Sequence, residues 1–208
     1  MADRPSVFVV DDDPAMRESL EFLTESAGFS VESFPSGEAF LDSFDPKRPG
    51  CLVLDVRMPG MDGLQLQDKL QKMGASLPCI MLTAYGDVAM SVRAMRNGAI
   101  DFIEKPFSDQ RLIERVREAI GRDRVVRASI VGHAEIEARL SLLTEREREV
   151  LDLVVVGSQN KAIAATLGLS VKTIEVHRSR LMRKMKASSV AELVKTVLDL
   201  ERETADQA

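Results

Sequence analysis

Five polar side chains that could do chemistry together each lie at or near the end of a short apolar segment in the first half of the chain. Three are carboxylates (Asp11, Asp12 and Asp55), one is a hydroxyl group (Thr83) and one is an ammonium group (Lys105). A lone aspartate after an apolar run usually caps a helix or makes a turn. The set is more informative, because carboxylates that lie close together raise each other's pKa unless a cation neutralises them.

A metal-assisted phosphoryl transfer would use all five groups. Oxygen ligands with room for water suit Mg²⁺, for which Mn²⁺ could substitute. Two carboxylates could neutralise the metal and leave an oxygen of Asp55 free to attack a phosphoryl group, which would give an aspartyl phosphate. Lys105 would balance the charge of the phosphoryl oxygens, and the Thr83 hydroxyl would donate a hydrogen bond to one of them. This chemistry requires that the five residues meet in space.

The elements before these residues can bring them together. Short apolar runs bounded by turn residues predict strands at 7–10, 31–34, 51–54, 79–82 and 101–104. Apolar residues at helical spacing predict helices at 14–27, 36–44, 64–70, 88–95 and 112–120. Strands that alternate with helices predict an α/β fold with a doubly wound, five-stranded parallel sheet. The carboxyl ends of its strands share one edge, so the five residues are expected to converge there.

Composition bounds the class of protein. The chain has 208 residues, of which 45% are hydrophobic and 29% charged, as in a soluble globular protein. No apolar run approaches the roughly 18 residues of a membrane span, and the N-terminus lacks a signal-peptide pattern, which favours a cytoplasmic protein without a membrane partner. Cys51 and Cys79 lie in apolar runs and are expected to be core residues rather than a disulfide or a metal site.

Charge divides the chain into two parts. Residues 1–122 contain 14 Lys and Arg against 20 Asp and Glu, whereas residues 141–208 contain 11 against 10. Six basic residues lie between Ser170 and Lys186, where Glu175 is the one acidic residue. A concentrated basic stripe of this kind suggests binding to nucleic acid. We therefore expect a first domain at 1–122 and a second at 141–208.

The linker at 123–140 mixes charged and apolar residues. Val125, Val126, Ile130 and Ile136 could continue the preceding helix, with Gly132 as a weak point. Disorder is the alternative, and the apolar content argues against it.

The second domain is expected to contain four helices. Thr144 and Glu147 form a capping box for the first, and Gly168 ends a short helix that begins at Asn160. Ser170 caps a longer helix that is basic on one face, with Val171, Ile174, Leu181 and Met185 expected on its core face. Ser189 and Glu192 cap the last helix. Two helices joined by a glycine-containing turn, the second basic, indicate a helix-turn-helix. An ordinary helical hairpin with a solvated basic face is the alternative.

The motifs around the five polar residues resemble those of the response-regulator receiver domain, which has a flavodoxin-like fold. The resemblance covers residues 5–122 and includes Val10–Asp12, Leu54–Gly60, Leu82–Ala84 and Glu104–Phe107. It implies that Asp55 accepts a phosphoryl group from a sensor histidine kinase.

The same resemblance assigns roles to the neighbouring residues. Asp12 would bind the metal directly and Asp11 through water, with the Arg57 backbone carbonyl as a third protein ligand beside Asp55. Thr83 and Phe102 would form a switch pair, although Phe102 could instead be a plain core residue. Tyr85 and the Arg57 side chain occupy positions that influence the lifetime of the phosphate. Phosphorylation is expected to expose a homodimer surface within 88–104.

The second part resembles the LuxR-type four-helix DNA-binding domain over residues 141–200. The segments 143–151, 160–164 and 173–178 carry this resemblance, and the pairing of domains resembles the FixJ-like branch of response regulators. Double-stranded promoter DNA is the implied partner. The positions expected to face base edges, phosphates or the groove are Lys161, Lys172, Thr173, Glu175, Val176, His177, Ser179, Arg180, Arg183 and Lys184.

Two other classes of function remain open from the residues. A Mg²⁺ phosphohydrolase could turn over an aspartyl phosphate, but no lid insertion or general acid is visible beside Asp55. A signalling adaptor would act through protein contacts alone. The preferred hypothesis is a phosphorylation-dependent transcription regulator whose chemistry is limited to self-phosphotransfer and slow self-dephosphorylation.

Overall fold

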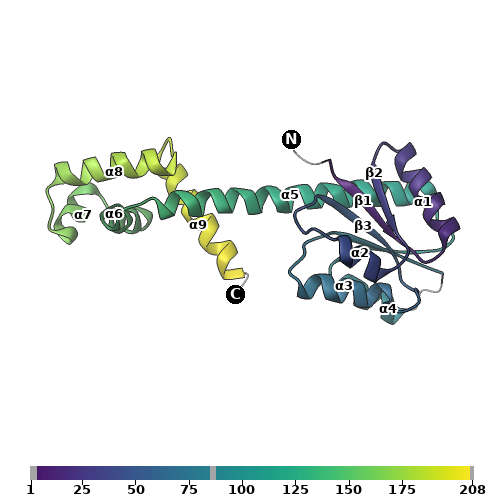
Figure 1. Ribbon diagram of the computed structural model, residues 1–208. Coiled ribbons are helices and arrows are strands. Elements are labelled where there is room, and N and C mark those ends of the chain that lie inside the picture. Colours follow the sequence, from purple (N-terminus) through teal and green to yellow (C-terminus); the bar gives the residue numbers. More distant parts are fainter. Residues whose placement is uncertain (1–3, 85–87, 207–208) are drawn as a thin grey trace. The chain divides into compact units, whose positions relative to one another are not determined.

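The computed structural model describes residues 4–84 and 88–206, which separate into two compact units, Met1–Ala128 and Ser129–Ala208 (Figure 1). Tyr85, for which a role in phosphate lifetime is expected, lies outside the described residues.

The first unit contains a five-stranded, fully parallel sheet in the order β2-β1-β3-β4-β5. The strands are β1 (Ser6–Val10), β2 (Ser30–Phe34), β3 (Gly50–Asp55), β4 (Cys79–Thr83) and β5 (Ala99–Glu104). Every residue of β1, β3 and β4 is buried, as their continuous apolar runs predict. The predicted doubly wound α/β fold is confirmed.

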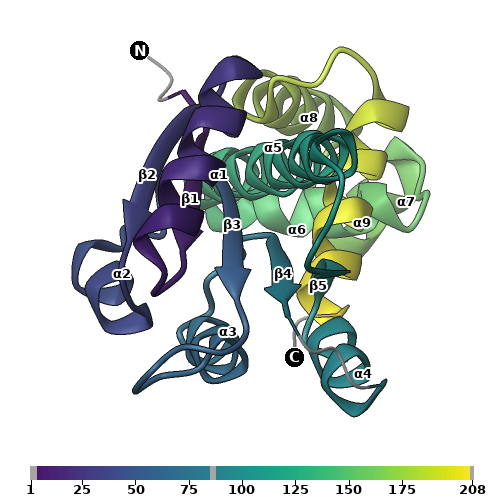
Figure 2. The ribbon, with the colours of Figure 1, turned by 90° about the vertical axis from the view of Figure 1, so that its right-hand side faces the viewer.

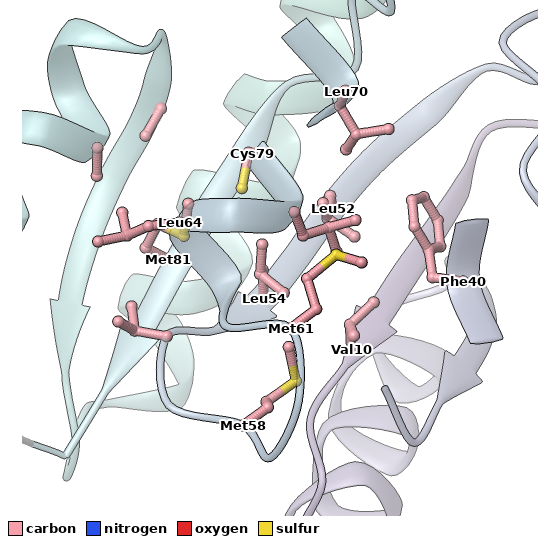
Figure 3. Close-up of a cluster of buried hydrophobic side chains, with 14 of the residues drawn as sticks. Val10, Phe40, Leu52, Leu54, Met58, Met61, Leu64, Leu70, Cys79 and Met81 are labelled. Atoms are coloured by element: carbon pink, nitrogen blue, oxygen red, sulfur yellow. The ribbon is translucent and has the colours of Figure 1, made fainter. Parts of the chain in front are cut away.

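Helices cover both faces of the sheet (Figure 2). One face packs on α1 (Pro14–Ser26) and the first part of α5 (Asp109–Ser141), through residues such as Leu20 and Val116. The other face packs on α2 (Gly37–Ser43), α3 (Gly63–Lys72) and α4 (Val88–Arg96). Figure 3 shows this second core, in which Phe40 of α2 and Leu64 of α3 gather with Leu52 and Leu54 of β3. The sheet is therefore covered by helices on both faces.

Helix α5 runs past residue 120 and through the linker at 123–140 to Ser141, over the residues that could continue it. Asp123 is buried and accepts a hydrogen bond from the Gly50 N–H at 2.9 Å. Arg127 donates both to Asp123 and to the backbone carbonyls of residues 46–48. A side chain at Gly50 could not fit, because an added Cβ would lie 2.0 Å from the Ser6 carbonyl oxygen. These contacts fix about one turn of the linker helix to the first unit.

The second unit contains four helices and the end of α5. They are α6 (Glu145–Val155), α7 (Asn160–Leu167), α8 (Val171–Met185) and α9 (Val190–Asp206). The expected capping box of Thr144 and Glu147 is present, and Gly168 ends α7 in the left-handed conformation. Ile174, Leu181 and Met185 are buried. The expectation that Val171 faces the core is wrong. Its side chain is 42% exposed, because Val171 is the first residue of α8 and this end of the helix lies outside the core.

Both cysteines are free and buried in the sheet, as expected. In the part of the chain that the structure describes, no helix combines the length and apolarity needed to cross a bilayer.

Candidate functional sites

The ends of three strands bring Asp11, Asp55 and Lys105 together. Asp11 directly follows β1, Asp55 is the last residue of β3, and Lys105 directly follows β5. The Lys105 Nζ atom donates to Asp11 Oδ2 at 2.8 Å and to Asp55 Oδ1 at 2.5 Å. All three side chains are mostly buried, with exposed fractions of 2% for Asp11, 9% for Asp55 and 16% for Lys105. One ammonium group thus bridges two carboxylates that lie far apart in the sequence.

Burial sets the protonation equilibria of this cluster. It raises the pKa of Asp55, and Asp11 raises it further, while Lys105 and the Arg57 N–H act in the opposite direction. Burial alone would lower the pKa of Lys105, but its hydrogen bonds to Asp11 and Asp55 outweigh that effect and raise it. Burial and the Lys105 ammonium group therefore act on the pKa of Asp55 in opposite directions, an arrangement typical of functional sites.

Backbone groups complete the surroundings of the two buried aspartates. The Arg57 N–H donates to Asp55 Oδ2 at 2.6 Å, so both oxygens of Asp55 accept a hydrogen bond. Asp11 Oδ1 accepts the Asp13 N–H at 3.0 Å, and Asp13 in turn caps α1. Arg17 donates to the Asp11 carbonyl at 2.7 Å, a contact that the sequence did not suggest. The carboxylate positions are therefore fixed by the turns that follow each strand.

The other expected members of the site lie around this centre in different ways. Asp12 is exposed, and so is the Arg57 side chain. Thr83 is fully buried at the end of β4, and its carbonyl accepts the Lys105 N–H at 2.7 Å. Phe102 is partly buried and packs against the core formed with α2, α3 and α4, which suits either a switch or a core role.

The donor set suits a hard divalent cation. Three carboxylates (Asp11, Asp12 and Asp55) stand against the single Lys105 ammonium group, and all potential protein ligands are oxygens. Within residues 4–84 and 88–206, however, no three His, Cys, Asp or Glu side chains are already grouped to hold a metal ion. Lys105 occupies the space between two of the acidic side chains in this state.

The second candidate site is the outward face of α8. Most of the residues expected to contact DNA are exposed. Lys161 lies on α7, and the others lie on α8: Lys172, Glu175, Val176, Ser179, Arg180 and Arg183. Thr173 and His177 are partly buried, and the Thr173 hydroxyl pairs with the Ser170 cap.

Lys184 differs from the other residues expected to contact DNA. Its Nζ atom donates to Glu147 Oε2 at 2.6 Å and to the Leu142 carbonyl at 2.9 Å. The Glu147 partner lies 37 residues away in the sequence, so helical spacing could not have revealed it. The structure therefore gives Lys184 a contact within the domain that its basic character alone did not indicate.

A parallel sheet with a buried Asp–Lys–Asp cluster at its strand ends, followed by a helix-turn-helix unit, defines the class of protein. The family model of the response regulator receiver domain matches residues 7–117, and that of the bacterial regulatory proteins of the luxR family matches residues 141–197. The chain belongs to the response regulators that combine these two domains, and within them to the FixJ-like branch.

Individual relatives support this placement over nearly the whole chain. The transcriptional regulatory protein FixJ of Azorhizobium caulinodans is 47% identical over 192 residues, which are 92% of this chain and 91% of that protein. The solved structure of the response regulator StyR is 43% identical, with a TM-score of 0.87 over 94% of this chain and 99% of that one. Full-length FixJ from B. japonicum is 40% identical, with a TM-score of 0.58 over 96% and 98% of the two chains. These named relatives are transcription regulators or response regulators rather than classical enzymes.

Proposed function

We propose that Asp55 accepts a phosphoryl group from a sensor histidine kinase and that this modification controls dimerisation and promoter binding. The observation that carries the proposal is the Lys105 ammonium group between Asp11 and Asp55, buried where the strands end. No other carboxylate in the described residues ends a central strand and contacts this ammonium group. Asp55 therefore has a nucleophilic oxygen beside the Lys105 ammonium group, which can pair with the negative charge of an incoming phosphoryl group.

The residues divide the chemistry between them. An oxygen of Asp55 would attack the phosphorus atom as the bond to the donor's leaving group breaks. Lys105 can pair with a phosphoryl oxygen while it keeps its bond to Asp11, and the buried Thr83 hydroxyl can donate to another. Asp11, Asp12, Asp55 and the Arg57 backbone carbonyl would hold a Mg²⁺ ion, which Mn²⁺ could replace. When bound, the metal would neutralise negative charge on the phosphoryl group. Slow loss of the phosphoryl group to water would reset the protein.

The switch would run from Thr83 towards the surface of α4 and β5. A phosphoryl group adds nearly two negative charges beside Thr83 and can draw its hydroxyl group inward, which opens space for Phe102. A change from mostly inactive to mostly active needs about 5.5 kcal/mol of differential binding, much of which a few charge-assisted hydrogen bonds could provide. Val88, Val92 and Met95 already expose apolar surface on α4. We propose this face as the dimer surface.

The exposed face of α8 would read the promoter. Glu175, Val176 and Ser179 are suited to base edges, because an acidic group can accept from a cytosine amine and an apolar group can contact a thymine methyl. Lys161, Lys172, Thr173, Arg180 and Arg183 are proposed to contact phosphates, with His177 at the margin.

Phosphoryl labelling tests the central step. The full chain is incubated with Mg²⁺ and acetyl phosphate, and its intact mass is measured. Wild type should gain one phosphoryl group, whereas Asp55→Asn should gain none. Asp62→Asn is the matched control, because Asp62 is a cap of α3 away from Lys105 and its loss should leave labelling intact. Labelling of Asp55→Asn, or labelling of wild type in excess EDTA, would contradict the proposal.

A further inference from the structure

The six basic residues of α8 and its C-cap fall into two groups by their partners. Arg178 and Lys184 donate to polar groups on other helices or loops of the second unit. The remaining four make no side-chain hydrogen bond or ion pair to any described residue, and they are Lys172, Arg180, Arg183 and Lys186. The division does not follow from the sequence, in which all six look alike.

Arg178 joins the two helices of the helix-turn-helix. Its Nη1 atom donates to Asn160 Oδ1 at 2.7 Å, across 18 residues of sequence. Asn160 is the first residue of α7, and the preceding Gln159 makes no side-chain capping bond. The Asn160 side chain is thus used for a bond to α8 rather than for the start of its own helix. This bond fixes the middle of α8 against the beginning of α7.

Lys184 makes a second connection near the other end of α8. Its partners, Glu147 on α6 and the Leu142 carbonyl, belong to neither helix of the helix-turn-helix. The Glu147 side chain is 3% exposed and that of Lys184 is 30% exposed, so the carboxylate end of this pair is shielded from water. Two polar connections to two different helices restrict both the tilt of α8 and its rotation about its own axis.

We infer that Arg178 and Lys184 are positioning residues, which orient α8 for DNA, and that the unpaired cations provide the phosphate contacts. The inference rests on the proposed DNA-binding function of α8 and assigns its basic residues to separate roles. Base reading by Glu175 and Val176 depends on that orientation, since a supporting contact must hold a recognition group within a fraction of an ångström. The Asn160 amide oxygen carries no charge, so the Arg178 guanidinium group stays positively charged. The hydrogen bond nevertheless directs this group towards the protein.

A double-mutant cycle on Arg178 and Asn160 tests the inference. The probe is the duplex that full-length wild type, treated with acetyl phosphate and Mg²⁺, selects from a random-sequence library. Arg178→Met keeps the aliphatic stem and removes the donors, and Asn160→Ala removes the acceptor. Each single variant should bind about ten-fold more weakly, which is about 1.4 kcal/mol, and the double variant should bind no more weakly than either.

The salt dependence separates positioning from phosphate contact. Loss of one phosphate contact reduces the slope of log K against log salt by about 0.9. Lys172→Ala should show that reduction, whereas Arg178→Met, Asn160→Ala and Lys184→Met should keep the wild-type slope. Arg146→Ala, which removes an exposed cation from α6, serves as the control for general charge effects. Circular dichroism verifies that each variant is helical at the assay temperature. Asn160→Ala, which removes no charge, tests the Arg178–Asn160 bond by itself if an arginine variant loses helix content.

Two results would contradict different parts of the account. If the losses of Arg178→Met and Asn160→Ala simply add, or if Arg178→Met flattens the slope by about 0.9, Arg178 contacts phosphate and the inference is wrong. If wild type selects no sequence from the library, the proposed function itself fails.

Discussion

Replacement of Lys184 by methionine should destabilise the second unit by about 2 kcal/mol at pH 7. Burial alone would raise the pKa of Glu147, but hydrogen bonds from Lys184 and Thr144 bring it down from its usual 4.5 to about 2. At about 1.36 kcal/mol per pKa unit, this lowering favours the folded carboxylate by a net value of about 3.4 kcal/mol, after the opposing effect of burial. Lys184 provides only part of this, and its side chain is 30% exposed, so screening reduces its share to about 2 kcal/mol.

The effect of Lys184→Met should depend on pH in a defined direction. Because the folded pKa of Glu147 lies below its unfolded value, the stabilisation is fully present above about pH 4.5 and is lost as the pH falls towards 2. The difference between wild type and Lys184→Met should therefore be constant from pH 7 to about pH 5 and should shrink below that.

Hydrogen exchange followed by mass spectrometry is the suitable assay. The chain has no tryptophan and a single tyrosine, in the first half, so intrinsic fluorescence does not report on the second unit. Peptides from α6 and α8 give the local opening free energy directly. Lys186→Met is the matched control: it removes a cation at the end of the same helix that has no described partner, and it should cost less than about 0.5 kcal/mol. Equal costs for the two variants, or a difference that persists unchanged at pH 3, would refute this reasoning.

Three further predictions concern other parts of the molecule. Asp123→Asn should cost the first unit about 2 kcal/mol and speed amide exchange in the α5 segment 120–128, because it breaks a buried ion pair; Glu114→Gln, an exposed change on the same helix, should not. Val92→Asp should keep the protein monomeric in sedimentation with acetyl phosphate and Mg²⁺, whereas a dimer unaffected by this charge would place the interface elsewhere. Glu175→Ala should change which bases are preferred, by about 1–3 kcal/mol at particular positions in a panel of single-base duplexes, and an equal loss at all positions would contradict base reading.

The fold of the first unit was predictable because its signals are local. Apolar runs such as 51–54, bounded by turn residues, identify the strands, and their alternation with helices defines a parallel sheet. The convergence of Asp11, Asp55 and Lys105 then follows from topology, since parallel strands end at a common edge. What topology does not provide is the detail that one ammonium group contacts both carboxylates.

Interactions between distant residues account for what the sequence did not reveal. Beyond residue 120, helix α5 is held to the first unit because Asp123 and Arg127 find partners in the 46–50 segment, and no spacing rule links these positions. A charged pair of this kind on a helix usually lies on a solvated face, so its spacing does not indicate that Asp123 is buried. Lys184 was grouped with the DNA-contacting residues because it is basic and lies on α8. Its partner Glu147 lies on another helix, so the sequence does not show that the two residues meet.

Control of DNA binding by a phosphoryl group on Asp55 is tested most directly by one titration. The affinity of full-length protein for the selected duplex is measured with and without acetyl phosphate in the presence of Mg²⁺, for wild type and for Asp55→Asn. Phosphorylation should strengthen wild-type binding by about ten-fold or more, within the usual range of coupling between sites, and should leave Asp55→Asn unchanged. An equal response of both proteins, or no response of a wild type whose mass shows full phosphorylation, would contradict the account.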